Sequence, residues 1–297
     1  MTAARTEASA PRGTARRRRI PVAYWLLLPG AFWLFLFFVI PFYSLLATSL
    51  YDPSGGAVSG YRMTWSFANY WHTLSDYVGP LGRSLAYGSI ATAMCLLLGY
   101  PLAYAIAFKA GRWRNLMLVM VIAPFFTSFL IRTLAWKLIL ADQGFIVQTM
   151  QSLHLLDPGG RLLATPFAVV AGLTYNFIPF MVLPLYAALE KIDGRLLEAA
   201  QDLYASPLRA FLKVTLPLSL PGVVAGTLLT FIPAVGDYIN AQLLGNTETR
   251  MLGNVIQSLF ITVGDYPAAA SLSMTLMLLI VALVYFYVHR SGTEELL

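Results

Sequence analysis

Long apolar stretches alternate with shorter polar segments along most of the chain. Six of these stretches are long enough to cross a hydrocarbon core of about 30 Å, which takes about 20 helical residues. Because backbone N–H and C=O groups in lipid must be satisfied within the segment, each stretch is expected to form a helix. The pattern therefore predicts an all-α membrane protein, a bundle of six transmembrane helices over residues 22–50, 84–108, 116–138, 166–189, 218–243 and 268–289.

The polar segments outside these stretches set the predicted organisation. Residues 19–290 form one membrane domain, preceded by a disordered basic cytoplasmic tail over 1–18 and followed by a cytoplasmic tail over 291–297. The run Arg16–Arg19 also resembles the start of a signal peptide. The apolar stretch behind it is longer than the usual signal-peptide core of about 7–15 residues. We therefore expect an uncleaved first span.

Composition agrees with a membrane location. The chain has 297 residues, of which 58% are hydrophobic and 11% are charged, whereas soluble domains carry about 25% charged residues. Its mean hydropathy is +0.67. An ordinary soluble enzyme is therefore excluded, and so is a disordered protein, because disorder needs low hydrophobicity and high charge.

The basic residues are unevenly distributed along the chain, whose net charge is +6. If both termini lie on one side of six spans, that side carries 14 of the 20 basic residues and the other side carries 5, with Arg132 inside a span. By the positive-inside rule, both termini are cytoplasmic. Basic clusters beside a membrane meet anionic headgroups, so we expect Arg16–Arg19 to contact membrane lipid and not nucleic acid.

The sequence contains no pattern typical of catalysis or metal binding. It has no Gly-Lys pair, and therefore no phosphate-binding loop for a nucleotide. Its histidines, His72, His154 and His289, are far apart, and Cys95 is its single cysteine. We predict no catalytic residue, no metal ligand and no cofactor bound by this chain, so ATP hydrolysis would need a separate protein.

The most polar connector, residues 190–217, contains a short amphipathic helix. From Arg195 to Leu203, four apolar side chains share one face, while Glu198 and Asp202 share another. A helix of this length is marginal in water, because isolated helices need about 12–15 residues. It either docks on a partner protein or lies flat against its own bundle, and its amphipathic pattern alone does not separate the two.

Motifs in and around this connector resemble those of the permease subunits of ABC importers. Glu198-Ala199-Ala200, followed by Val214-x-Leu216-Pro217, is similar to the signature of that family, with Tyr204 where the family usually has glycine. The likeness covers about residues 22–290. Within that family, the chain most resembles the spermidine/putrescine-type group. The resemblance lies in three stretches, Gly99–Tyr104, Pro124–Arg132 and Phe231–Asp237.

The resemblance implies a larger assembly in the bacterial inner membrane. The connector helix would be the coupling helix that enters a groove of a cytoplasmic ATPase dimer, and that dimer would hold ATP and Mg²⁺. A second homologous permease and an extracytoplasmic solute-binding protein would complete the transporter. The implied solute is a small cation, a polyamine such as spermidine or putrescine. The implied coupling residues are Glu198, Ala199, Ala200, Asp202, Tyr204, Leu216 and Pro217.

Charged residues inside the apolar stretches are costly and mark functional positions. Asp237 is the only acid well inside a stretch, and Arg132 is the only base. Pro233 and Gly236 predict an interruption of the fifth span next to Asp237, and transporters tend to bind substrate at interrupted helices. Asp237 therefore either attracts a cationic substrate or forms an internal ion pair with Arg132.

Ammonium groups are held by ion pairing and by contact with aromatic faces. Asn240 shares a helical face with Asp237 at i, i+3 if the helix continues. For each uncharged residue of the path, packing or interhelical hydrogen bonding is the alternative role. The residues that we predict along a substrate path are Asp237, Tyr238, Asn240, Tyr175, Asn176, Thr127 and Trp136.

Other functions are compatible with parts of the pattern. The same kind of permease can carry another small solute, such as an aminophosphonate or an iron complex. A self-sufficient secondary transporter or channel would need no ATPase-docking helix. A membrane-embedded enzyme is disfavoured, because the sequence has no paired carboxylates, metal cluster or nucleophile–base set.

Overall fold

The computed structural model describes residues 22–56, 60–157 and 159–290, so the predicted tails over 1–18 and 291–297 lie outside the described residues. The chain divides into two compact units, Met1–Leu45 and Leu46–Leu297. We describe each unit by itself. Five apolar helices among the described residues are long enough to cross a membrane, and a sixth span is formed if one sharply bent pair is counted together.

The first unit contains most of the first predicted span, whose last residues belong to the second unit. Helix α1 (Val22–Leu34) continues through a π-helical turn, η1 (Phe35–Val39), into α2 (Ile40–Ser49). Leucine and phenylalanine occupy every side of this helix, and from Leu26 to Tyr43 nearly all side chains are exposed. A helix that is apolar all round is typical of a membrane span. The stretch predicted over 22–50 is therefore helical as expected.

The second unit is built around three long helices that pack on one another, α4 (Val78–Tyr104), α8 (Pro166–Glu190) and α11 (Leu216–Gly236). Small residues permit the close approach of their backbones, as is common in membrane bundles. A Cβ atom on Gly226 of α11 would lie 3.1 Å from the carbonyl oxygen of Met181 in α8. Cys95, Leu173 and Met181 are fully buried in the core between these helices.

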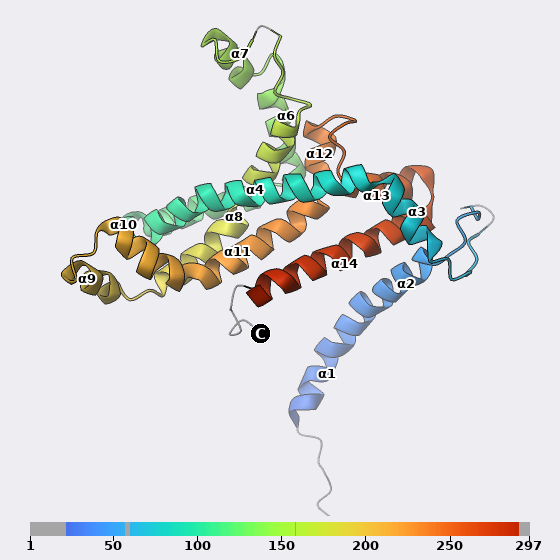
Figure 1. The fold of residues 1–297 in the computed structure, drawn as a ribbon, viewed down its shortest axis with the longest axis horizontal. Helices are drawn as coiled ribbons and strands as arrows, with labels where there is room; N and C mark the ends of the chain where they lie inside the picture. Colours follow the sequence, from blue (N-terminus) through green and yellow to red (C-terminus); the bar gives the residue numbers. More distant parts are fainter. Residues whose placement is uncertain (1–21, 57–59, 158, 291–297) are drawn as a thin grey trace, which may run out of the picture. The chain divides into compact units, whose positions relative to one another are not determined.

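Further helices flank the three central ones. The predicted last span is α14 (Tyr266–Arg290), and α4 is prolonged by η2 (Ala105–Lys109). Figure 1 shows α9 (Gly194–Asp202) and α10 (Pro207–Ala210) at one end of the bundle. At the other end lie α3 (Ala68–Asp76) and α13 (Leu252–Ser258), which continues into η6 (Leu259–Val263). The spans predicted over 84–108, 166–189 and 268–289 are confirmed as helices.

The prediction of one continuous helix over 116–138 is wrong. After η3 (Gly111–Trp113), α5 (Arg114–Ile122) ends in the 3₁₀ turn η4 (Ala123–Phe126), and the chain then bends by 94°. Helix α6 (Phe129–Leu140) begins beyond the bend and is followed by α7 (Phe145–Ser152). Thr127 and Ser128 have extended ψ values of 148° and 137°. Because their backbones are extended, no helical hydrogen bonds cross the bend.

The fifth span differs from its predicted bounds at both ends. It begins at Pro207, because α10 and the π-helical turn η5 (Phe211–Thr215) run on into α11 without interruption. The connector that holds α9 is correspondingly shorter than residues 190–217. At the other end α11 stops at Gly236, and the short α12 (Ile239–Leu244) follows after Asp237 and Tyr238. The predicted interruption beside Asp237 is therefore present.

Candidate functional site

Asp237 lies in the break between α11 and α12 and is only 9% exposed. One of its carboxylate oxygens, Oδ1, accepts hydrogen bonds from the backbone N–H of Asn240 at 2.8 Å and from Asn240 Nδ2 at 3.2 Å. Asn240 is fully buried. The i, i+3 relation predicted for this pair is present, although Asp237 caps a new helix and does not continue the old one.

Asn240 links this break to two other helices. Its Oδ1 accepts from Nδ2 of Asn176 in α8 at 3.0 Å, and Asn176 Nδ2 also donates to Thr133 Oγ1 in α6 at 3.1 Å. Gly172 makes the approach of α12 to α8 possible, because a Cβ at Gly172 would lie 2.8 Å from Asn240 Oδ1. Asp237, Asn240, Asn176 and Thr133 thus form one buried polar network, which we call the Asp237 network.

Two acceptor oxygens of the Asp237 network have no hydrogen-bond partner among the described residues. Asn176 is 1% exposed, and its Oδ1 is unpaired. At Asp237 both hydrogen bonds end on Oδ1, so Oδ2 accepts none, although it is not closed off from solvent as Asn176 Oδ1 is. Buried acceptors without donors are unfavourable unless a donor arrives. An ammonium group supplies three donors and no acceptor, so it matches what these two oxygens lack.

Arg132 is buried as well, but it does not neutralise Asp237. The ion pairs within the described residues are Arg161–Asp142 and Arg114–Glu190, and neither involves Asp237. The guanidinium carbon of Arg132 lies 5.7 Å from the ring centres of both Phe125 and Phe129. The internal ion pair that the sequence left open is therefore not formed in this structure.

The other residues of the predicted path are divided between two places. The rings of Trp136 and Tyr175 contact one another at a centroid distance of 5.5 Å, and Tyr175 directly precedes Asn176 of the Asp237 network. Thr127 lies instead in the bend between η4 and α6, where its hydroxyl donates to the carbonyl of Pro124 at 2.8 Å. Tyr238 lies in the break between α11 and α12, and the residue is 39% exposed.

Sequence reasoning missed two residues that hold this region together. Thr133 joins the Asp237 network from α6, and Asn254 in α13 donates from Nδ2 to the carbonyl oxygen of Tyr238 at 2.7 Å. Both are uncharged polar residues in apolar surroundings. Their polarity was a weak signal, since Thr and Asn commonly link helices in membrane bundles. Only the tertiary structure shows which helices they join.

Both polar and apolar side chains of the connector helix α9 are exposed on the surface of the chain. Asp193 begins the helix by accepting from the backbone N–H of Arg195 at 3.0 Å. Leu196 is 47% exposed and Leu203 is 82% exposed, so the rest of the chain leaves much of the apolar face uncovered. Among the predicted coupling residues, Ala200 and Leu216 are half-buried, and the exposed ones are Glu198, Ala199, Asp202, Tyr204 and Pro217.

Tyr204 closes the turn after α9 in a left-handed backbone conformation, with φ of 56°. The N–H of Ala205 donates to the carbonyl of Ala200 at 3.0 Å, which is the hydrogen bond of a Schellman cap. The turn that family members make with glycine is therefore made here with tyrosine. An ion pair between Glu190 and Arg114 joins the end of α8 to the start of α5.

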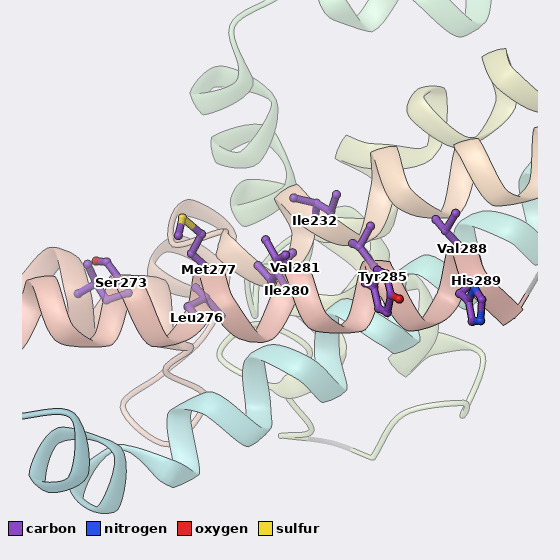
Figure 2. Close-up of a pocket in the computed structure, with 11 residues that line it drawn as sticks. Ile232, Ser273, Leu276, Met277, Ile280, Val281, Tyr285, Val288 and His289 are labelled. Carbon is purple, nitrogen blue, oxygen red and sulfur yellow. The ribbon is translucent and has the colours of Figure 1, made fainter. Parts of the chain in front are cut away.

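A separate hollow of about 720 Å³ runs along α14 (Figure 2). Its lining comes from α14, from Ile232 of α11 and from Ile256 of α13, and it is almost entirely apolar. Such a lining suits acyl chains or another helix better than a charged solute. No cluster of three or more His, Cys, Asp or Glu side chains occurs in the part of the chain that the structure describes.

Broken apolar helices around a buried polar network are typical of membrane transport proteins. Comparison with solved structures agrees on the fold. A chain of the bacterial alginate ABC transporter in complex with alginate pentasaccharide-bound periplasmic protein superposes with a TM-score of 0.70 at 17% identity, covering 91% of this chain and 94% of that chain. Residues 96–291 match the family described as binding-protein-dependent transport system inner membrane component, and the chain belongs to that family.

Two similar relatives are permeases of spermidine/putrescine transport systems. The spermidine/putrescine transport system permease protein PotB of Escherichia coli (strain K12) is 38% identical over 261 residues, which is 87% of this chain and 94% of that protein. The PotB protein of Haemophilus influenzae is 38% identical over 256 residues, or 86% of this chain and 89% of that protein. The chain is thus an inner-membrane ABC importer permease, a transport subunit and not an enzyme.

Proposed function

We propose that this permease carries a small cationic solute, a polyamine such as spermidine or putrescine, across the inner membrane. The observation that carries the proposal is a pair of acceptors without donors, the buried Asn176 Oδ1 and the neighbouring Asp237 Oδ2. The identity to PotB proteins over most of the chain supports the same solute class. An anionic solute would be repelled by Asp237.

Each part of the path has its own role in this proposal. Asp237 supplies charge where water is scarce and opposite charges attract strongly. Asn176 and Asn240 supply amide oxygens, and the Trp136–Tyr175 pair supplies aromatic faces for cation–π contact. Tyr238 and Thr127 lie at the two breaks, where the path would pass between helices. One carboxylate cannot balance a di- or trication, so further acids would come from a second homologous permease.

The proposed partners follow from the exposed connector. Helix α9 would dock on one subunit of a cytoplasmic ATPase dimer that binds ATP and Mg²⁺, with Glu198, Ala199, Ala200, Asp202 and Tyr204 on α9 and its turn, and Leu216 and Pro217 beside them. An extracytoplasmic binding protein would deliver the solute to the opposite face. Both termini would be cytoplasmic.

Replacing Asp237 tests the substrate path. Asp237→Asn keeps the shape of the side chain and removes its charge, so uptake of labelled spermidine and putrescine is expected to fall by at least about tenfold, the effect of losing one buried charge contact. Expression and association with the ATPase should stay normal. Asp157→Asn, on an exposed loop, is the matched control and should leave uptake unchanged.

Two outcomes would contradict this role of Asp237. Rescue of Asp237→Asn by a second substitution, Arg132→Gln, would mean that the two charges form a structural pair in some state of the transporter. Undiminished polyamine uptake by Asp237→Asn would remove Asp237 from the substrate path. Separately, competition by an aminophosphonate or an iron complex and not by a polyamine would reassign the solute.

The coupling role of α9 has a separate test. Glu198→Lys reverses an exposed charge at the proposed interface, so transport-coupled ATP hydrolysis by the purified complex should fall while the chain still inserts. Glu248→Lys is the matched control, because Glu248 is also exposed but lies in the loop between α12 and α13. Unchanged hydrolysis with Glu198→Lys would show that α9 is only a connector.

A further inference from the structure

Arg132 is a buried cation that forms no ion pair with any of the described residues. The residue is 8% exposed, and its Nε and Nη1 atoms have no hydrogen-bond partner. The rings of Phe125 and Phe129, each 5.7 Å from the guanidinium carbon, offer cation–π contact but accept none of its hydrogen bonds. Removing a charge from water without a partner is strongly unfavourable. Arg132 therefore has an unmet requirement for an acceptor.

The same place holds a second source of positive potential. Helix α6, 12 residues long, begins at Phe129, directly after the 94° bend. Ser128, at its N-cap, makes no side-chain capping hydrogen bond. The first N–H groups of a helix have no acceptor within the helix, and its dipole favours a negative charge there. Because Phe129 is the first residue of α6 and Phe125 lies just before the bend, the Arg132 guanidinium lies next to this helix end.

The surface around this positive site is apolar and uncovered. Phe126 is 86% exposed, Ile131 62%, Leu130 48% and Leu134 40%. A charged group surrounded by apolar side chains is the composition of an interface centre, where the apolar ring excludes water from a charged contact. Neither an aqueous surface nor plain lipid contact accounts for a guanidinium at such a position.

We infer that Arg132 and the N-terminus of α6 receive the carboxylate of an acidic side chain from the second permease. This inference rests on the proposed pairing of two permeases and adds the residue and the chemistry of their contact. A carboxylate is small and planar, so it fits a guanidinium that is almost closed off. A lipid phosphate carries a much bulkier headgroup. The proposed solute is a cation, which Arg132 repels.

The inference makes a prediction with opposite signs for the free chain and for the complex. In the free chain the Arg132 charge is unpaired, so Arg132→Gln should leave its unfolding temperature unchanged or raise it. In the complex the same variant removes one partner of a buried pair, so association should weaken. A residue with a merely structural role inside the chain would give a loss of stability in both.

This chain carries an affinity tag and is co-expressed with the second permease and the ATPase. The complex is purified through that tag, and the amount of second permease that copurifies is measured. Arg132→Gln is expected to lower the recovered second permease by at least about tenfold, the effect of truncating a buried interface charge. Arg132→Lys keeps the positive charge and should lower the recovery of the second permease by a smaller factor. Arg62→Gln, at an exposed arginine, is the control and should change nothing. Full recovery with Arg132→Gln, or a free variant chain that unfolds at a lower temperature, would overturn the inference.

Lipid is tested as the other source of an anion. Nanodiscs containing phosphatidylglycerol are compared with nanodiscs of phosphatidylcholine for the free chain. Stabilisation by phosphatidylglycerol that disappears in Arg132→Gln would assign the site to a lipid phosphate and overturn the inference. A suppressor search with Arg132→Glu then identifies the donor, because a Lys or Arg in place of an acid of the second permease should restore recovery. The proposed function stands or falls separately, on uptake by the unaltered complex.

Discussion

At the scale of single residues, Tyr204 shows how a sequence can depart from a family pattern and keep its geometry. The absence of glycine left the turn after α9 unsupported by sequence. The structure forms the turn with φ of 56° at Tyr204, whose side chain is 95% exposed. A left-handed conformation costs a non-glycine residue about 1–2 kcal/mol. The cap hydrogen bond between Ala205 and Ala200 and the open surroundings of the side chain allow this.

Replacing Tyr204 should change the stability of this turn in a predictable direction. Tyr204→Gly removes about 1 kcal/mol of backbone strain, so hydrogen exchange of the amides over residues 197–205 should slow several-fold. Tyr204→Val places a β-branched side chain in the same conformation and should speed the exchange. Equal exchange rates in the two variants would show that φ at position 204 carries no strain.

Residue spacing predicted the pairing of Asp237 with Asn240 but not the rest of the network. The i, i+3 relation is local, so it is visible in the sequence. Asn176 was a candidate because of its polarity, yet its contact with Asn240 joins two helices through residues that are 64 positions apart in sequence. Thr133 gave no comparable signal. The sequence equally left open the Arg132–Asp237 pair, which is not among the ion pairs of the described residues.

At the scale of elements, hydropathy predicted where the helices lie better than where they break. The break at Asp237 has proline and glycine just before it, whereas the bend at Thr127 and Ser128 has only Pro124, inside a run whose composition suits a helix. Pro124 sits at the start of the 3₁₀ turn, where a missing N–H costs nothing, and the chain turns three residues later. Tertiary packing therefore sets the position of that bend.

Close packing of α12 on α8 gives a prediction for Gly172. A methyl group there would lie 2.8 Å from Asn240 Oδ1 and would also press on Leu244. Overpacking of this kind costs about 1–3 kcal/mol, so Gly172→Ala should lower the unfolding temperature and reduce uptake by displacing Asn240. Gly82→Ala is the matched control: Gly82 is also helical, no atom lies within 4 Å of its added Cβ, and the change should be neutral or stabilising.

Normal stability and uptake in Gly172→Ala would mean that α12 can move away from α8 without consequence. The Asp237 network would then not be held by the contact between these two helices, and the two asparagines would have to find each other by side-chain adjustment alone. Reduced uptake with normal stability would instead mean that Gly172→Ala disturbs the substrate path without weakening the fold.

At the scale of the whole molecule, the sequence predicted the class of fold, an all-α bundle of apolar helices, because burial in lipid acts on every residue of a span. The positions of single side chains depend on a few contacts and were predicted less completely. The side of the membrane on which each loop lies is a prediction from another distributed property, the bias of 14 basic residues against 5. Sidedness and the bent third span can be tested together.

Three single-cysteine variants make this test: Ser75→Cys in α3, Ser152→Cys in α7 and Lys191→Cys after α8, all at exposed positions. Cys95 is fully buried and should not react. If α5 and α6 together form a span and the termini are cytoplasmic, an impermeant maleimide labels positions 75 and 152 in sealed spheroplasts, and position 191 only after permeabilisation. If the bent pair is a re-entrant loop that returns to the cytoplasmic side, position 152 becomes protected and position 191 becomes reactive. Labelling at position 191 together with protection at 152 would therefore reduce the spans to five, place the α9 connector outside the cell and remove it from any contact with a cytoplasmic ATPase.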